Sequence, residues 1–136
     1  MKNNLINPKI SISAKLGIYS KFYNDIYFDK LNGIKESEHV YLNTNKLAEK
    51  FKKKQKFVIA ELGFGVGLNF LLTWKLWNEN RKSDASLTYI SFENAPLSKK
   101  EISRVYKKIK KLDQYSNLLL KNIPEKYQST HRIHFK

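Results

Sequence analysis

Apolar and polar positions in the middle of the chain predict two strands separated by a helix. Residues 57–61 begin with a continuous apolar run, which is typical of a strand buried on both faces of a parallel sheet. Residues 67–80 repeat large apolar side chains at helical spacing, and residues 87–92 predict a second strand that ends before Glu93. The pattern therefore indicates a strand, helix, strand unit with a right-handed crossover.

The region before this unit predicts a β-hairpin and a linking helix. Residues 12–28 are rich in aromatic and β-branched side chains and are expected to be extended. A turn at residues 30–33, which contain Asn-Gly, and a returning strand at residues 39–42 would complete the hairpin. Its aromatic side chains either pack on one another or stack on bases. Asn45 is expected to cap a helix over residues 46–54.

The last third of the chain predicts a two-faced helix. Ser98 and Glu101 have the spacing of a capping box. The expected apolar stripe is Ile102, Val105, Tyr106, Ile109 and Leu112. Lysine and arginine line another face, either as a solvated surface or as a track for RNA phosphates. Residues 115–121 predict a further helix ended by Pro124, and residues 131–135 predict the start of another strand.

Composition narrows the classes of protein. The chain has 136 residues, which suits one domain or part of one, and a formal charge of +14, which favours a polyanionic partner such as RNA. It has no cysteine, and its three histidines are scattered, so no metal site is expected. We expect no membrane span, because the longest apolar region is interrupted by Glu61, Asn69 and glycines. No secretory signal is recognisable, so a cytoplasmic location is expected.

Three of the five glycines, Gly63, Gly65 and Gly67, lie in one loop between the first strand and the helix. Glycines at such a turn let the backbone approach a nucleotide-type cofactor, or they serve close packing alone. A dinucleotide-binding fingerprint would need glycine at position 68, where this chain has Leu68, so a nicotinamide-dependent oxidoreductase is disfavoured.

Glu93, at the end of the second strand, stands where an acceptor for two ribose hydroxyls is needed. The alternative is a loop carboxylate paired with lysines. Glu61 either helps to orient a cofactor indirectly or bonds the backbone of the turn. No nucleophile triad, phosphate-binding Walker loop or glycosidase carboxylate pair is recognisable, and no catalytic base can be assigned.

Several blocks of sequence resemble one known family. These are Asp25-Ile26-Tyr27-Phe28, Asn32-Gly33, His39-Val40-Tyr41-Leu42, Asn45 with Leu47, residues 61–72, and residues 90–97. They are similar to the methyltransferase domain of the bifunctional tRNA 5-methylaminomethyl-2-thiouridine biosynthesis protein. The resemblance implies a class I methyltransferase fold that uses S-adenosylmethionine to methylate an aminomethyl group on a wobble uridine of tRNA. The implied cofactor-binding residues are Glu61, Gly63, Phe64, Gly65, Gly67, Asn69 and Glu93.

The resemblance also implies that later parts of this domain lie beyond the matching segment. We therefore expect an α/β fold with a partial Rossmann-like, incomplete doubly wound sheet after an N-terminal β-hairpin. The expected units are residues 1–56 and 57–136. The chain is expected to be an N-terminal fragment, inactive alone, which a separate chain would complete. The alternative is a non-catalytic basic module that binds RNA.

Overall fold

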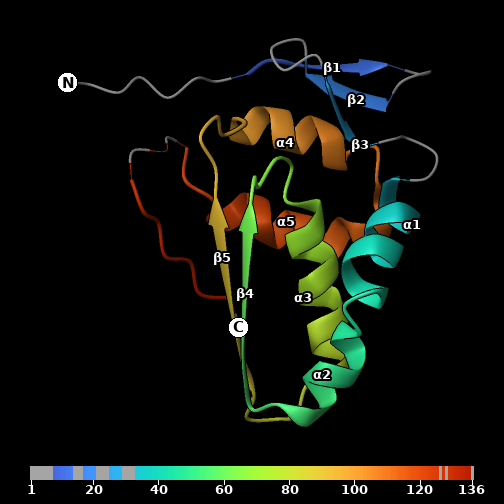
Figure 1. Cartoon of the computed structure of the whole chain (residues 1–136). Helices are drawn as coiled ribbons and strands as arrows, with labels where there is room; N and C mark the ends of the chain where they lie inside the picture. The colour runs from blue at the N-terminus through green and yellow to red at the C-terminus, as the bar shows by residue number, and fades with distance from the viewer. Residues whose placement is uncertain are drawn as a thin grey trace.

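The computed structural model describes residues 8–13, 17–20, 25–28, 33–125, 127 and 129–135. These residues form a mixed α/β structure with two small sheets (Figure 1). The N-terminal sheet is antiparallel, in the order β1 (Ile10–Ser13), β2 (Gly17–Ser20), β3 (Asp25–Phe28). The second sheet pairs β4 (Lys56–Leu62) with β5 (Ser86–Phe92) in parallel.

The returning strand expected at residues 39–42 is wrong. Helix α1 (Gly33–Ser37) runs directly into a π-helix, η1 (Glu38–Asn43), which contains this segment. Helical winding buries Leu42 in the core and carries Tyr41 to the side of the second sheet. Tertiary packing has therefore overridden the strand preference of these side chains. Of the expected turn, residues 30–32 lie outside the described residues, as do the side chains of β3.

The linking helix is present, but its start differs from the prediction. Helix α2 (Leu47–Lys53) buries Leu47 and Phe51, which lie four residues apart. The residue before the helix is Lys46, which adopts a left-handed conformation with φ of 50°. Asn45 is not a cap, because its side-chain amide donates backwards to the Tyr41 carbonyl at 2.8 Å.

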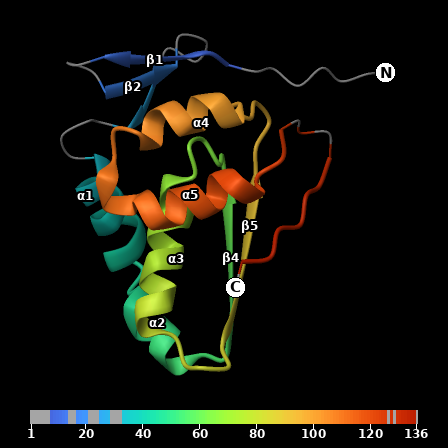
Figure 2. The same cartoon turned by 180° about the vertical axis from the view of Figure 1, so that it is seen from behind.

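The strand, helix, strand unit is confirmed. Helix α3 (Leu68–Asn80) connects β4 to β5, and the two strands are in register from Lys56 beside Ser86 to Leu62 beside Phe92. Burial on both faces of β4 was predicted and is wrong, since exposed and half-buried positions alternate along both strands. Figures 1 and 2 show α3 and α5 on the same side of the two strands. No described helix covers the opposite side.

The capping box is confirmed and also holds the N-terminal sheet. At the start of α4 (Lys99–Tyr106), the Glu101 amide donates to Ser98 Oγ at 3.3 Å, and the Ser98 amide donates to Glu101 Oε2 at 3.2 Å. The other oxygen, Glu101 Oε1, accepts from the Ile10 amide of β1 at 3.0 Å. One buried carboxylate therefore satisfies both the helix end and the first strand.

A short 3₁₀ turn, η2 (Lys110–Leu112), leads from α4 into α5 (Asp113–Asn122), which ends before Pro124. The predicted helix at residues 115–121 lies within α5. The predicted stripe is buried from Ile102 to Leu112, in one core cluster with apolar side chains of α2 and α3. The single helix predicted to carry it is wrong, because α4 ends at Tyr106, so Ile109 and Leu112 lie beyond it. The division of the chain at residue 56 stays a prediction.

The strand predicted at residues 131–135 is wrong, because this segment has no regular secondary structure. Side-chain packing holds it instead. The ring centroid of Phe135 lies 4.4 Å from that of Trp74 and 5.6 Å from that of Phe70. In the described part of the chain, no helix is both long and apolar enough to cross a membrane.

Candidate functional site

The glycine loop lies between the end of β4 and the start of α3. Gly63, Gly65 and Gly67 all have positive φ, at 87°, 52° and 77°, a region that side-chain-bearing residues rarely adopt. A Cβ at Gly67 would lie 2.6 Å from Cζ of the Phe64 ring, whereas a Cβ at Gly63 would meet nothing within 4 Å. Packing against Phe64 therefore demands glycine at position 67, while Gly63 faces open space.

Glu93 binds this loop directly. Its Oε2 accepts from the Gly65 amide and its Oε1 from the Ala95 amide, each at 2.9 Å. The loop is fixed to the second strand at another point too, because the Gly63 amide donates to the Phe92 carbonyl at 2.7 Å. The structure thus brings together the glycine loop and the strand-end carboxylate.

Glu93 keeps unused capacity to accept hydrogen bonds. A carboxylate offers about four acceptor positions, and two of those on Glu93 are used by backbone amides. None of the ion pairs formed within the described residues involves Glu93, so lysine pairing does not explain its position. Each of its oxygens can accept a further hydroxyl.

Glu61 lies on the α3 side of the sheet, next to Ser91 in register. Burial raises the pKa of the Glu61 carboxyl, and the negative charge of Glu93 raises it further. The polar side chains of Tyr89, Ser91 and Asn69 oppose this rise. Asn69, in the first turn of α3, is therefore close to Glu61. Phe64 belongs to the loop itself, and its ring centroid lies 6.2 Å from that of Phe70.

Tyr106 of α4 forms a hydrogen bond to the glycine loop, a contact that the sequence did not predict. Its buried hydroxyl donates to the Val66 carbonyl at 2.9 Å, and burial raises its pKa. The sequence placed Tyr106 in the apolar stripe of α4. The available signal was its hydroxyl, since a buried tyrosine normally needs a polar partner.

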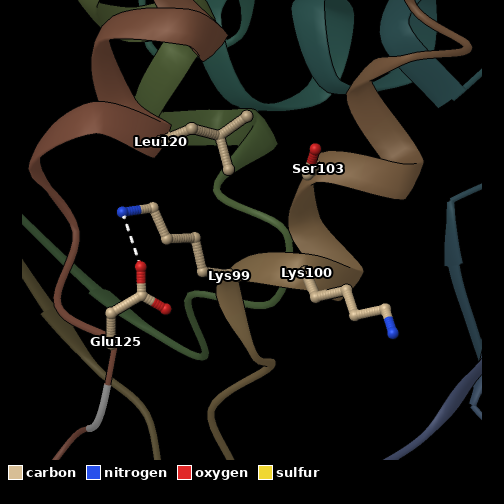
Figure 3. A pocket seen from close by; sticks show the side chains of 5 residues that line it. All are labelled: Lys99, Lys100, Ser103, Leu120 and Glu125. Carbon is tan, nitrogen blue, oxygen red and sulfur yellow. Dashed lines mark ion pairs between the residues drawn. The ribbon is translucent and has the colours of Figure 1, made fainter.

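A second candidate region lies between α4 and the end of α5, where a shallow hollow is lined by Lys99, Lys100, Ser103, Leu120 and Glu125 (Figure 3). Lys99 and Glu125 form an ion pair at 3.0 Å, and Lys100 points away from that pair. None of the predicted cofactor residues lines this hollow. Within the described residues, no three histidine, aspartate or glutamate side chains cluster as a metal site would require.

Comparison with known proteins finds relatives that carry the name MnmC. A search of protein-family models found no match. The tRNA 5-methylaminomethyl-2-thiouridine biosynthesis bifunctional protein MnmC of Marinomonas sp. is 37% identical over 95% of this chain and 19% of its own length. The protein of the same name from Methylobacillus flagellatus is 40% identical over 75% of this chain and 16% of its own length.

A solved structure supports the relationship. The crystal structure of MnmC2 from Aquifex aeolicus matches with a TM-score of 0.54 and 26% identity, over 67% of this chain and 31% of that one. The chain spans less than a fifth of the length of the MnmC proteins that it matches. With identities of 37–40% across most of its residues, the chain belongs to the MnmC family and corresponds to a small segment of those proteins.

Proposed function

We propose that this chain supplies the first part of an S-adenosylmethionine-dependent methyltransferase domain. Its substrate would be the 5-aminomethyl group of 2-thiouridine at the wobble position of tRNA. The observation that carries the proposal is the contact between Glu93 and the Gly65 amide, because it joins a glycine loop and a strand-end carboxylate into one site. The names of the MnmC relatives support tRNA as the substrate.

The residues fit such a cofactor. The positive φ and open surroundings of Gly63 leave backbone exposed to a ligand, and Glu93 keeps acceptor capacity for two ribose hydroxyls. Phe64, Gly65, Gly67, Asn69 and Glu61 would complete this wall of the site. When bound, the cofactor would supply an activated methyl group. The role of these residues would be alignment of that group with an amine nucleophile.

Binding of S-adenosylmethionine, followed by isothermal titration calorimetry, tests the proposal. Glu93→Ala should weaken binding by about 1.5–3 kcal/mol, because a charge-assisted acceptor is lost. Glu93→Gln separates the loss of the charge from the loss of the acceptor, since it removes the charge and keeps one acceptor oxygen. Glu79→Ala, which removes an exposed carboxylate from α3, is the matched control. Equal affinities for the Glu93→Ala and Glu79→Ala proteins would contradict the role of Glu93.

A second candidate function rests on the basic residues after Ser98. Lys100, Arg104, Lys107, Lys108 and Lys110 are exposed, and none is in an ion pair within the described residues. The charge of these side chains suits a non-catalytic module that binds RNA phosphates. Salt-dependent binding of tRNA without any binding of S-adenosylmethionine would favour this module over the methyltransferase.

We further propose that another polypeptide, equivalent to later parts of the MnmC methyltransferase domain, completes the domain by covering the open side of the β4–β5 sheet. The support is the side of β4 and β5 that carries exposed Val58, Leu62, Ile90 and Phe92. Co-expression with the later part of the domain from an MnmC relative tests this, with co-purification as the measurement.

A further inference from the structure

A row of polar side chains crosses the covered side of the second sheet and ends at Glu61. Tyr41 comes from η1 and Tyr89 from β5, and their hydroxyl oxygens lie 3.1 Å apart. Tyr89 lies two residues before Ser91, the register partner of Glu61, so its side chain is on the same face of the sheet as Glu61, and it lowers the pKa of that carboxyl. A residue from outside the strand, helix, strand unit thus bonds the tyrosine that neighbours the carboxylate before the glycine loop.

The donor and acceptor capacities of these groups determine the direction of the hydrogen bonds in the row. An ionised carboxylate only accepts hydrogen bonds, and the Tyr89 hydroxyl carries a single hydrogen. When Tyr89 donates to Glu61, its oxygen must accept from Tyr41. Thr73 of α3 also lies close enough to lower the pKa of Tyr41, but its Oγ1 forms no hydrogen bond among the described residues.

The row contains buried polar atoms whose hydrogen-bonding needs are not met. Glu61 Oε1, Thr73 Oγ1 and Ser91 Oγ are buried and have no hydrogen-bond partner among the described residues. Buried polar groups of this kind depend on whichever donors face them, and bonds in a row strengthen one another. Of the polar side chains that lower the pKa of Glu61, only Tyr89 is bonded, within the described part of the chain, to a residue from outside the strand, helix, strand unit, which is Tyr41 of η1.

We propose that Tyr41 and Tyr89 are positioning residues for Glu61. The bonded pair of hydroxyls aims a donor at the carboxyl group before the glycine loop, and so links η1 to the site. The link exists in the free protein. Only the expected effect of the tyrosine pair on S-adenosylmethionine binding rests on the proposed function.

The ionisation of Glu61 reports on this link. Burial and the charge of Glu93 raise the pKa of Glu61, while Tyr89, Ser91 and Asn69 lower it. Tyr89→Phe removes a donor to the charged carboxylate, so it should raise that pKa further. Tyr41→Phe leaves Tyr89 in place but removes the bond that polarises its hydroxyl. It should shift the pKa in the same direction by a smaller amount.

Carbon-13 NMR titration of the glutamate carboxyl groups measures these shifts in the whole chain, with Glu61→Gln identifying the Glu61 signal. The control is Tyr115→Phe, which removes a hydroxyl from a ring that packs on Trp74, away from Glu61. We expect an upward shift of the Glu61 midpoint in Tyr41→Phe and Tyr89→Phe and none in Tyr115→Phe. S-adenosylmethionine affinity is measured on the same proteins, and Tyr89→Phe should lower it.

A wild-type Glu61 midpoint in a folded Tyr41→Phe protein would overturn the proposal, and so would an equal shift in Tyr115→Phe. Should Tyr89→Phe fail to fold, Tyr41→Phe decides alone, because the Tyr41 hydroxyl bonds Tyr89 and is not itself among the groups that shift the pKa of Glu61. If no protein binds S-adenosylmethionine, the proposed function fails. The titration still decides the positioning role.

Discussion

The two faces of the β4–β5 sheet carry similar amounts of apolar side chain but have opposite environments. On the α3 side, Phe57 and Ile59 pack against the core, and Leu71 of the facing helix is 0% exposed. On the other side, Leu62 is 88% exposed and Phe92 is 61% exposed. A sheet face that meets water normally carries polar residues. The sequence of these strands is therefore suited to burial on both faces, while the fold buries one.

The largest expected difference in stability comes from a matched pair of leucines, one buried in α3 and one on the open face of the sheet. Leu71→Ala should lower the free energy of unfolding by about 2–5 kcal/mol, because it opens a cavity in the core. Leu62→Ala removes the same atoms from the open face and should change it by about 0.5 kcal/mol or less. Urea denaturation followed by circular dichroism measures both. Equal losses would show that the open face is buried in solution.

Tyr106→Phe tests the support of the loop from the covered side. The change leaves the Val66 carbonyl buried without its donor, so we expect a loss of about 1–3 kcal/mol in the free energy of unfolding. The same denaturation experiment measures it, with Tyr127→Phe, outside the core cluster, as the control. A loss no larger than that of the control would mean that the hydroxyl adds nothing to the covered side.

Glu61→Gln tests the polar part of the covered face through pH. The folded protein holds the pKa of Glu61 above its ordinary value of 4.5, so ionisation of this group costs stability as pH rises through 4.5 toward the raised pKa. The stability of Glu61→Gln relative to wild type should therefore increase with pH across this window and level off above it. Urea denaturation at several pH values gives the difference.

The same subtraction for Glu49→Gln, an exposed glutamate of α2, gives the control slope. A difference for Glu61→Gln that follows the control at every pH would contradict the effect of burial on Glu61.

The smallest effect on stability is expected on the open face. Leu62→Ser with Phe92→Ser should leave the free energy of unfolding within about 0.5 kcal/mol of wild type, since both side chains are exposed. The double variant should also bind less of a hydrophobic dye, because the apolar patch is reduced. Unchanged dye fluorescence would show that this face is not the apolar surface that the dye detects.

Features fixed by local chemistry could be predicted from the sequence. Ser98 and Glu101 form their capping box because both partners lie within one turn. The glycine loop follows its strand because few residues other than glycine adopt its backbone angles. The helix after it was visible from the spacing of Trp74 and Trp77.

Features fixed by distant contacts could not be predicted. His39-Val40-Tyr41-Leu42 has strand-forming side chains, and its helical form depends on the core around Leu42 and on Tyr89. The contact of Glu93 with Gly65 was expected only as proximity, since the sequence does not show which amides a carboxylate will accept. Tyr41 and Tyr106 were missed as site residues because their partners lie 48 and 40 residues away.

The bond between Glu101 and Ile10 has a consequence for the order of folding. It joins positions 91 residues apart, so β1 cannot form this contact until about three quarters of the chain has been synthesised and α4 has its first turn. Closing so long a loop is slow, and contacts of high sequence separation delay folding. The first strand to leave the ribosome would thus be among the last to dock. Until this contact forms, Ser98 alone would donate hydrogen bonds to the Glu101 carboxylate.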